Sequence, residues 1–318
     1  MPKNKVKHFI DLNVISSQDL RQILTLAVKL KKDKNLAQQT KLLPHKNLAM
    51  IFEKNSTRTR VSFEVGINHL GGHAIVMNKN DMQLGKGETV SDTAKVLSRF
   101  VDAIMIRSNS HQTILDLEKY ATVPVINALS DFSHPCQIMA SILTIEEHLG
   151  KIAGKKLVWF GDQNNVLNSY IHAAKSFGFE LVISSPKELD FCAAEIKKAV
   201  KSGAKISCVS DAKKAAKDAD VLIADTWFSM GDGSEKNDAL RQNKINLLMP
   251  YQVNSKLMKL AKKQAIFTHC LPAYRGFEVS ADVIDSSKSV VFDEAENRLH
   301  VQKAILLWAL QPKSTSKN

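Results

Sequence analysis

The stretch KLVWFGDQNNVLNSYIHAAKSFGFELVIS, residues 156–184, has an alternation of apolar and helical segments that predicts the fold class. An apolar run at 156–161 is followed by a helical pattern at 165–177 and by a second apolar run at 180–184. Gly178 stands where a helix would end in a left-handed residue. Two apolar strands connected by a helix are typical of a parallel sheet that is covered by helices.

The same alternation continues on both sides of this stretch. We expect further strands at 47–53, 74–78, 102–107, 123–127, 205–209, 220–225, 265–269 and 289–292. We expect further helices at 61–70, 90–100, 135–149, 190–202 and 294–310. A chain of 318 residues is too long for one ordinary core. The predicted fold is therefore α/β with two domains, each a mostly parallel sheet with helices on both faces, and the boundary is placed at Leu149-Gly150-Lys151.

Composition narrows the class of protein. The N-terminus lacks the apolar core of a signal peptide, and no apolar run approaches the ~20 residues that span a bilayer. The four cysteines (Cys136, Cys192, Cys208 and Cys270) show no paired spacing, which fits a reducing cytoplasm. The net charge of +12, from 44 basic and 32 acidic residues, fits a solvated lysine-rich surface, or binding to nucleic acid, to an acidic surface or to an anionic small substrate.

The segment Ser56-Thr57-Arg58-Thr59-Arg60 directly follows the strand at 47–53 and opens a helix. A helix N-terminus offers unpaired N–H groups and a partial positive charge, and hydroxyl and guanidinium groups complete a nest for phosphate. A simple N-cap would explain one hydroxyl group but not the whole cluster. The segment lacks the GxxxxGK[ST] pattern, so a nucleoside triphosphate is not implied.

Two more candidates stand at strand ends in the first half. Arg107 ends the strand at 102–107, where it is either a rim ion pair or a ligand contact. His134-Pro135-Cys136-Gln137 opens the helix at 135–149, with the proline at the first helical turn. His134 either caps this helix or hydrogen-bonds a carbonyl oxygen on which charge develops.

Three candidates occupy strand ends in the second half. The turn GDQNNVLNS (161–169) has one glycine where a dinucleotide site needs three, and its Asn168 offers an amide. Asp225 could hold a cationic amine with help from Ser229, although a plain turn is the simpler reading. Cys270 follows His269 at the end of the strand at 265–269. Its thiol is either part of a site at this edge of the sheet or a buried structural group. His269 and Cys270 are adjacent potential metal ligands, but the sequence has no matching second pair of ligands, so we expect no metal.

Four motifs in this order resemble the ornithine carbamoyltransferases: Ser-Thr-Arg-Thr-Arg, His-Pro-Cys-Gln, Asp-x-x-x-Ser-Met-Gly and His-Cys-Leu-Pro. The resemblance extends from about residue 8 to 311. The related aspartate carbamoyltransferases share the first two motifs, but they lack Ser-Met-Gly and have a His-Pro-Leu-Pro type of segment. The resemblance therefore favours ornithine as the acceptor, although position 226 is threonine where the motif often has valine.

The resemblance implies a role for each motif residue. Residues 1–149 would bind carbamoyl phosphate, the last helix (294–311) would pack back on that domain, and residues 150–293 would bind ornithine. The implied carbamoyl phosphate site consists of Ser56, Thr57, Arg58, Thr59, Arg60, Gln83, Arg107, His134, Pro135, Cys136, Gln137, Cys270, Leu271 and Arg298. The implied ornithine site consists of Asn168, Asp225, Ser229 and Met230. In this family three subunits share active sites, with Gln83 reaching a neighbour, so a homotrimer or an assembly of trimers is expected.

The implied reaction gives citrulline and phosphate, in arginine biosynthesis or in the reverse direction, without a cofactor. Arg58, Arg107 and His134 would polarise the carbonyl group, and Cys270, oriented by Asp225, would assist the amine. We count these five as the catalytic residues. Two other classes stay open: a nicotinamide-dependent oxidoreductase, which the missing glycines disfavour, and a nucleic-acid-binding protein.

Overall fold

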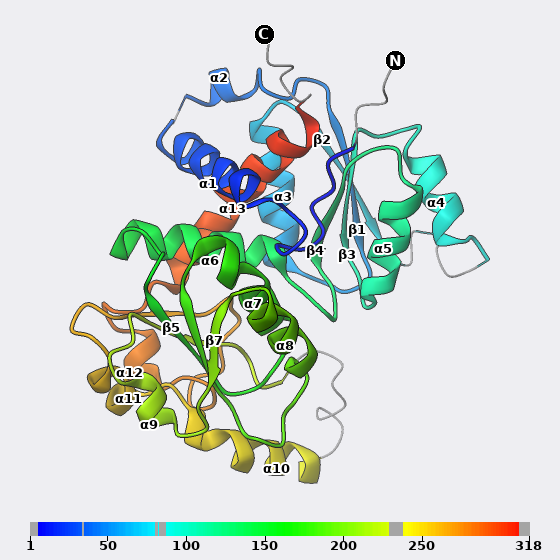
Figure 1. Ribbon diagram of the computed structural model, residues 1–318. Coiled ribbons are helices and arrows are strands. Elements are labelled where there is room, and N and C mark those ends of the chain that lie inside the picture. Colours follow the sequence, from blue (N-terminus) through cyan, green and yellow to red (C-terminus); the bar gives the residue numbers. More distant parts are fainter. Residues whose placement is uncertain (1–5, 34, 80–81, 83–86, 229–237, 312–318) are drawn as a thin grey trace. The chain divides into compact units, whose positions relative to one another are not determined.

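Strands and helices alternate along most of the chain in the computed structural model (Figure 1). The structure describes residues 6–33, 35–79, 82, 87–228 and 238–311. The chain divides into two units, one made of residues 1–139 with 298–318 and the other of residues 140–297. Each unit contains one parallel sheet with helices, so the predicted fold class is confirmed.

The sheet of the first unit has the strand order β2-β1-β3-β4, and all of its pairs are parallel. Its strands are β1 (Asn47–Phe52), β2 (His73–Asn78), β3 (Ala103–Arg107) and β4 (Val125–Leu129). After β1 the chain turns to one side for β2 and then crosses to the other side for β3. The carboxyl ends of β1 and β3 are therefore a topological switch point, where open α/β sheets bind their ligands.

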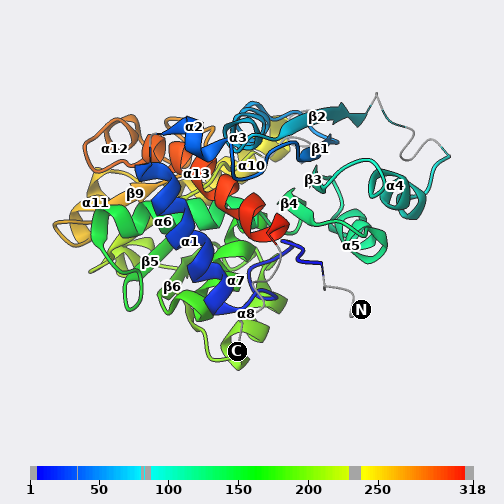
Figure 2. The same cartoon turned by 90° about the horizontal axis from the view of Figure 1, so that it is seen from above.

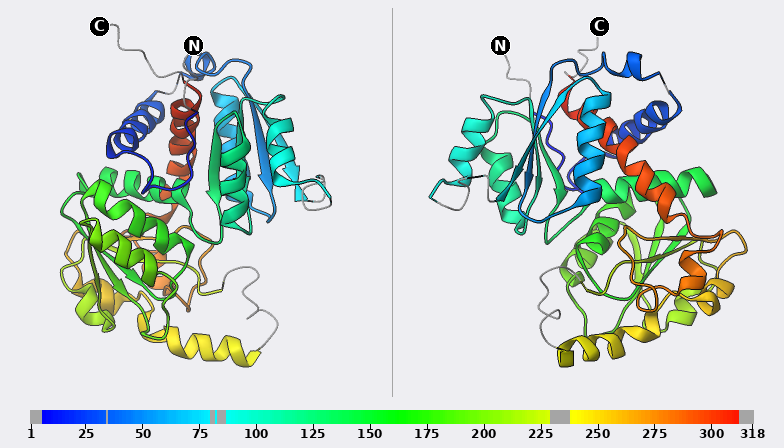
Figure 3. Two further views of the ribbon diagram at one scale, coloured as in Figure 1. Left: turned by 45° about the vertical axis from the view of Figure 1, so that its right-hand side comes forward. Right: turned by 180° about the vertical axis from the view of Figure 1, so that it is seen from behind.

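Helices cover both faces of this sheet (Figure 3). The helices of this unit are α1 (Ser17–Lys32), α2 (Leu36–Gln39), α3 (Thr57–His69), α4 (Val90–Leu97) and α5 (His111–Tyr120). The buried Ala94 of α4 and the buried Ile114 and Leu117 of α5 share a core with Ile51 and Ile104 of the sheet. On the other face lies α3, which buries Phe63 and Ile67.

The sheet of the second unit has the order β7-β6-β5-β8-β9 and is also parallel throughout. Its strands are β5 (Lys156–Phe160), β6 (Glu180–Ser184), β7 (Lys205–Cys208), β8 (Val221–Ala224) and β9 (Ile266–Thr268). Here the order reverses between β5 and β8, which places a second switch point at the carboxyl ends of these two strands.

Helices again lie on both faces of the sheet in the second unit (Figure 1). The helices of this unit are α7 (Asn165–Phe177), α8 (Ala193–Lys201), α9 (Ala212–Ala216), α10 (Asp238–Leu248), the 3₁₀ turn η3 (Met249–Tyr251), α11 (Ser255–Leu260) and α12 (Ala281–Ile284). One core packs α9, α11 and α12 against Val158 and Leu222. The predicted left-handed end at Gly178 (φ 70°) is confirmed, and Gly203, which follows α8, also has a positive φ (100°).

Two helices contain the points at which the chain passes between the units: α6 (Pro135–Leu149) and α13 (Val291–Leu310). The end of α13 lies beside α1 within the first unit (Figure 2). There the indole Nε1 of Trp308 donates to Asp19 Oδ1 at 2.9 Å. The buried Lys303 Nζ donates to Gln39 Oε1 at 2.6 Å, and burial lowers the pKa of this lysine.

The prediction of a strand at 289–292 is wrong. Ser289 forms only an isolated bridge with Phe267, and α13 begins at Val291. Two adjacent valines form an apolar run too short to separate a strand from the first turn of a buried helix. Among the described residues, no helix combines the length and the apolar character needed to cross a membrane.

Candidate active site

The N-terminus of α3 lies at the switch point of the first sheet. Ser56 is its N-cap, with an extended backbone (φ −160°), and its hydroxyl accepts from Thr59 N. Of the residues that follow, Thr57 and Arg60 are exposed, and Arg60 pairs with Glu64 at 3.5 Å on the helix surface. The buried Thr59 Oγ1 accepts from Arg298 Nη2 at 2.7 Å, so two predicted site residues from distant parts of the sequence are in contact.

Arg107 ends β3, directly beside the end of β1. The loop after it is fixed by Glu53, whose Oε2 accepts from Ser108 Oγ at 2.8 Å and from Asn109 N at 2.7 Å. Glu53 was not predicted as a functional residue. Its place at the end of the apolar run at 47–53 is the only signal that the sequence offers.

His134 precedes α6 and is 4% exposed. Burial holds the pKa of its imidazole well below the usual range, and the nearby Arg298, Arg107 and Arg58 lower that pKa further. A neutral imidazole beside three guanidinium groups can donate a hydrogen bond without adding a fourth positive charge. The arrangement suits an anionic ligand that also presents a carbonyl oxygen.

The residues after His134 belong to the first turn of α6. Cys136 is fully buried, its Sγ donates to Asn127 O at 3.3 Å, and burial raises the pKa of its thiol to about 12. This thiol is therefore a poor nucleophile. Gln137 is buried in the same turn, and Pro135 begins the helix as predicted.

Asp225 is the centre of the candidate site in the second unit. It follows β8, is 6% exposed, and accepts from Asn164 Nδ2 at 2.8 Å through Oδ2. Its other oxygen, Oδ1, accepts from Thr226 N at 2.8 Å and from Cys270 Sγ at 2.9 Å. These partners carry no positive charge, so none of them competes with a cationic ligand for this side chain.

Asn164 was missed by the sequence analysis, which named Asn168 instead. Asn164 is the N-cap of α7, and its Oδ1 accepts from Val166 N and Leu167 N while its Nδ2 reaches Asp225. An asparagine just before a helix and just after a strand was the available signal. Asn168 itself is fully buried in α7.

The segment after β9 is held by two buried acids. Glu294 Oε2 accepts from His269 N at 3.0 Å, and Glu278 Oε1 lies 3.3 Å from His269 Nε2. Leu271 N donates to His269 Nδ1 at 2.9 Å. His269, for which the sequence predicted no role of its own in the site, therefore sets the course of the backbone around Cys270 and Leu271.

The structure adds a third group to the pair His269-Cys270, which the sequence analysis set aside for lack of further ligands. Ligand atoms of Asp225, His269 and Cys270 lie within 4.8 Å of one another and could hold a metal ion. Three predicted residues, Gln83, Ser229 and Met230, lie outside the described residues.

Comparisons with known proteins agree with this geometry. Residues 7–147 match the model of the aspartate/ornithine carbamoyltransferase carbamoyl-P binding domain, and residues 153–309 match that of the Asp/Orn binding domain. The ornithine carbamoyltransferase of Rhodopseudomonas palustris is 53% identical over 311 residues, covering 98% of both chains. That of Brucella abortus is 53% identical over 308 residues, covering 97% of both.

Solved structures give the same result. The ornithine carbamoyltransferase from Pyrococcus furiosus has a TM-score of 0.87 and 46% identity, covering 96% of this chain and 97% of the other. The anabolic enzyme from Campylobacter jejuni has a TM-score of 0.85 and 43% identity, covering 95% and 98%. The chain therefore belongs to the aspartate/ornithine carbamoyltransferase family.

Proposed function

We propose that this chain transfers the carbamoyl group of carbamoyl phosphate to the δ-amine of L-ornithine, giving L-citrulline and phosphate. The observation that carries the proposal is the set of three arginines around the neutral, buried His134. Carbamoyl phosphate is an anion whose carbonyl group is bonded to a good leaving group. This substrate requires cations around its phosphate and a neutral hydrogen-bond donor for its carbonyl oxygen.

The phosphate is assigned to the N-terminus of α3. Its unpaired N–H groups and the hydroxyl groups of Ser56, Thr57 and Thr59 suit phosphate oxygens, and Arg58 and Arg60 add charge. Arg60 would exchange its exposed partner Glu64 for the ligand, which costs little because exposed ion pairs contribute about 0–1 kcal/mol.

The carbonyl group is assigned to Arg58, Arg107 and His134. As the amine attacks the carbonyl carbon, negative charge develops on the oxygen, and these donors stabilise it. Each well-placed donor is worth roughly 3–4 kcal/mol at most. Gln137 and Arg298 complete the environment of this substrate, with Pro135 and Cys136 forming the helical turn that holds His134.

Ornithine is assigned to the second unit. Asp225 would hold a cationic amine, with Asn168, Ser229 and Met230 completing the site and Cys270 and Leu271 beside the reacting groups. The attacking amine must be neutral. With a pKa of about 10.4, it is neutral in only about one molecule in a thousand near pH 7.4, which adds about 4 kcal/mol to the free energy of activation. We infer that Cys270, oriented by Asp225 at 2.9 Å, assists deprotonation or orientation of the attacking amine.

The assignment of substrates to domains follows the family models. Residues 1–149 with the helix at 294–311 would hold carbamoyl phosphate, and residues 150–293 would hold ornithine. A homotrimer or an assembly of trimers, in which Gln83 reaches a neighbour's substrate, is proposed from the resemblance of the motifs. A cytoplasmic location is supported by the four cysteines, all of them in the described part of the chain, because none of them forms a disulfide. A role in arginine biosynthesis is supported by the anabolic relative from Campylobacter jejuni.

The test is direct detection of the product. The protein is incubated with carbamoyl-labelled carbamoyl phosphate and ornithine, and labelled citrulline and free phosphate are quantified over time. After subtraction of the phosphate released in a protein-free control, the proposal expects equal amounts of both products, and omission of ornithine should abolish citrulline. Phosphate release above that control without citrulline, at the same rate with and without ornithine, would mean that the chain hydrolyses carbamoyl phosphate instead.

A further inference from the structure

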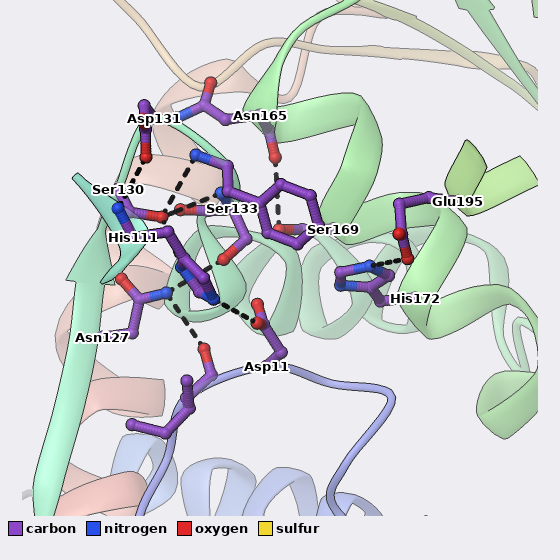
Figure 4. A network of polar contacts seen from close by, with 12 residues as sticks. Asp11, His111, Asn127, Ser130, Asp131, Ser133, Asn165, Ser169, His172 and Glu195 are labelled. Atoms are coloured by element: carbon purple, nitrogen blue, oxygen red, sulfur yellow. Dashed lines mark hydrogen bonds and ion pairs between the residues drawn. The ribbon is translucent and has the colours of Figure 1, made fainter. Parts of the chain in front are cut away.

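A histidine outside the assigned site connects two parts of the first unit (Figure 4). His111 is the first residue of α5, and its Nε2 lies 3.2 Å from Asp11 Oδ2 while its Nδ1 lies 2.9 Å from Ser130 Oγ. Its backbone N donates to Asp131 Oδ1 at 2.8 Å. His111 therefore touches the segment 130–133, which leads directly into His134, at two points.

The hydrogen bonds assign the tautomer of His111. Ser130 Oγ accepts from Phe132 N at 3.2 Å and from Ser133 N at 3.1 Å, so its own proton must point elsewhere. His111 Nδ1, at 2.9 Å, is a nearer acceptor than Ser133 O, at 3.4 Å. Nδ1 is then the acceptor and the proton of the ring is on Nε2, where it faces the carboxylate of Asp11.

The segment that His111 contacts has few degrees of freedom. Ser130 N donates to Ser133 O at 2.8 Å, which closes a tight turn. The fully buried Asn127 Nδ2 donates to Ser133 Oγ at 2.9 Å and to Ile10 O at 3.0 Å. A turn held on both sides in this way places the following residue, His134, at a fixed position.

A nucleophilic role for the Asp11–His111–Ser130 chain does not fit the structure. Ser130 has no exposed surface, and its oxygen already accepts two N–H groups of the turn. A substrate carbonyl could not reach it. The chain is suited instead to holding the turn in place.

We infer that His111 is a positioning residue for His134, acting by accepting the hydroxyl proton of Ser130. This inference rests on the proposed function. The imidazole of His134 stabilises charge only in the transition state, so a small displacement of its backbone lowers kcat more than it changes the KM for either substrate. A misplacement of about 1 Å can cost about 100-fold in rate, which leaves room for a measurable effect.

Two substitutions at this one position separate its two contacts. The amide of Asn in His111→Asn lies near the position of Nδ1, so its oxygen still accepts from Ser130. The amide of Gln in His111→Gln reaches the position of Nε2, so it still donates to Asp11 but leaves Ser130 without this acceptor. We expect H111Q to lower kcat by about tenfold with the KM for ornithine unchanged, and H111N to stay within about threefold of the wild type. The exposed His73→Gln on β2 is the matched control and should behave like the wild type.

The outcomes distinguish positioning from a merely structural role. Urea unfolding of both variants reports the structural contribution, and a similar loss of stability with no difference in kcat would overturn the inference. So would equal losses of kcat in H111N and H111Q. In the background of Ser130→Ala, H111Q should reduce kcat by less than about twofold, because the contact is already absent. A wild-type protein that forms no citrulline would refute the proposed function instead, before any variant is compared.

Discussion

The thiol of Cys270 donates to Oδ1 of Asp225 at 2.9 Å, which links the ends of the adjacent strands β9 and β8. Asn164, the N-cap of α7, reaches the other carboxylate oxygen at 2.8 Å. The carboxylate is thus held in one orientation by neutral donors from two other segments of the same unit. This arrangement prepares it to bind a cation without the entropic cost of ordering the side chain.

Asp225→Asn keeps the size of this side chain and removes its charge. We expect the KM for ornithine to rise by about 30-fold, which corresponds to about 2 kcal/mol, because the cationic amine loses its buried partner. The dissociation constant for carbamoyl phosphate, measured by calorimetry without ornithine, should stay within about twofold. A parallel loss of carbamoyl phosphate binding would contradict the assignment of the two substrates.

Cys270→Ala tests assistance to the amine. The neutral amine is scarce near pH 7, so loss of assistance should depress the rate mainly at neutral pH and much less near pH 9. The rate is measured from pH 6.5 to 9.5 at saturating carbamoyl phosphate. A pH–rate profile parallel to that of the wild type would refute the role of the thiol.

Arg107→Ala removes a guanidinium group at the switch point of the first sheet. We expect a loss of kcat of about 100-fold or more, because a charged donor to the carbonyl oxygen is lost where charge develops. Arg21→Ala, at a half-buried position on α1, is the comparison. Urea unfolding should show both variants folded, and near-normal turnover of Arg107→Ala would exclude its catalytic role.

The lowered pKa of His134 makes folding dependent on pH. The unfolded chain protonates this imidazole below about pH 6.5, whereas burial and three arginines keep it neutral in the folded chain. The unfolded state then binds more protons, so the stabilising contribution is complete above about pH 6.5 and is lost progressively at lower pH.

His134→Gln should remove that dependence. Between pH 7 and 5 the unfolding free energy of the variant should fall less steeply than that of the wild type, by up to about 1.4 kcal/mol per pH unit. Urea unfolding at four pH values measures it, with His73→Gln as control. Equal slopes for the wild type and His134→Gln would show that His134 protonates as easily in the folded chain as in the unfolded one.

Gly161→Ala tests the close approach at the end of β5. Gly161 has φ +101°, and a Cβ there would lie 2.8 Å from Nε1 of the fully buried Trp227. We expect a loss of unfolding free energy of about 2–4 kcal/mol from strain and overpacking together. Gly203→Ala has nearly the same φ, +100°, and meets nothing within 4 Å, so it should cost only about 1–2 kcal/mol. Equal costs for the two variants would mean that Trp227 moves aside freely.

Much of the fold could be predicted because parallel strands buried on both faces form apolar runs that are easy to find. β6 (Glu180–Ser184) and α7 (Asn165–Phe177) lie where the sequence predicted them. The failure at 289–292 is different in kind. Buried valines such as Val290 and Val291 are compatible both with a strand and with the first turn of a buried helix. Only the packing around Phe267 decides between the two structures.

The candidate site was predictable where a motif stands at the end of a strand. Arg107 and Asp225 were found in this way, because the carboxyl ends of strands β3 and β8 can be read from their apolar runs. Contacts made by residues outside the recognised motifs were not predictable. Nothing in the sequence indicates that Asn164 reaches Asp225 or that His111 reaches Asp11 and Ser130, since these contacts depend on the packing of separate elements.

The most direct test of the account is the choice of acceptor. Initial rates of carbamoyl transfer from carbamoyl phosphate are measured with ornithine, aspartate, putrescine and N-acetylornithine, and kcat/KM is compared. The account predicts that ornithine exceeds each of the others by at least about 100-fold, since Asp225 selects a cationic amine and the remaining site residues select an amino acid. Turnover with aspartate or putrescine that equals or exceeds turnover with ornithine would contradict it.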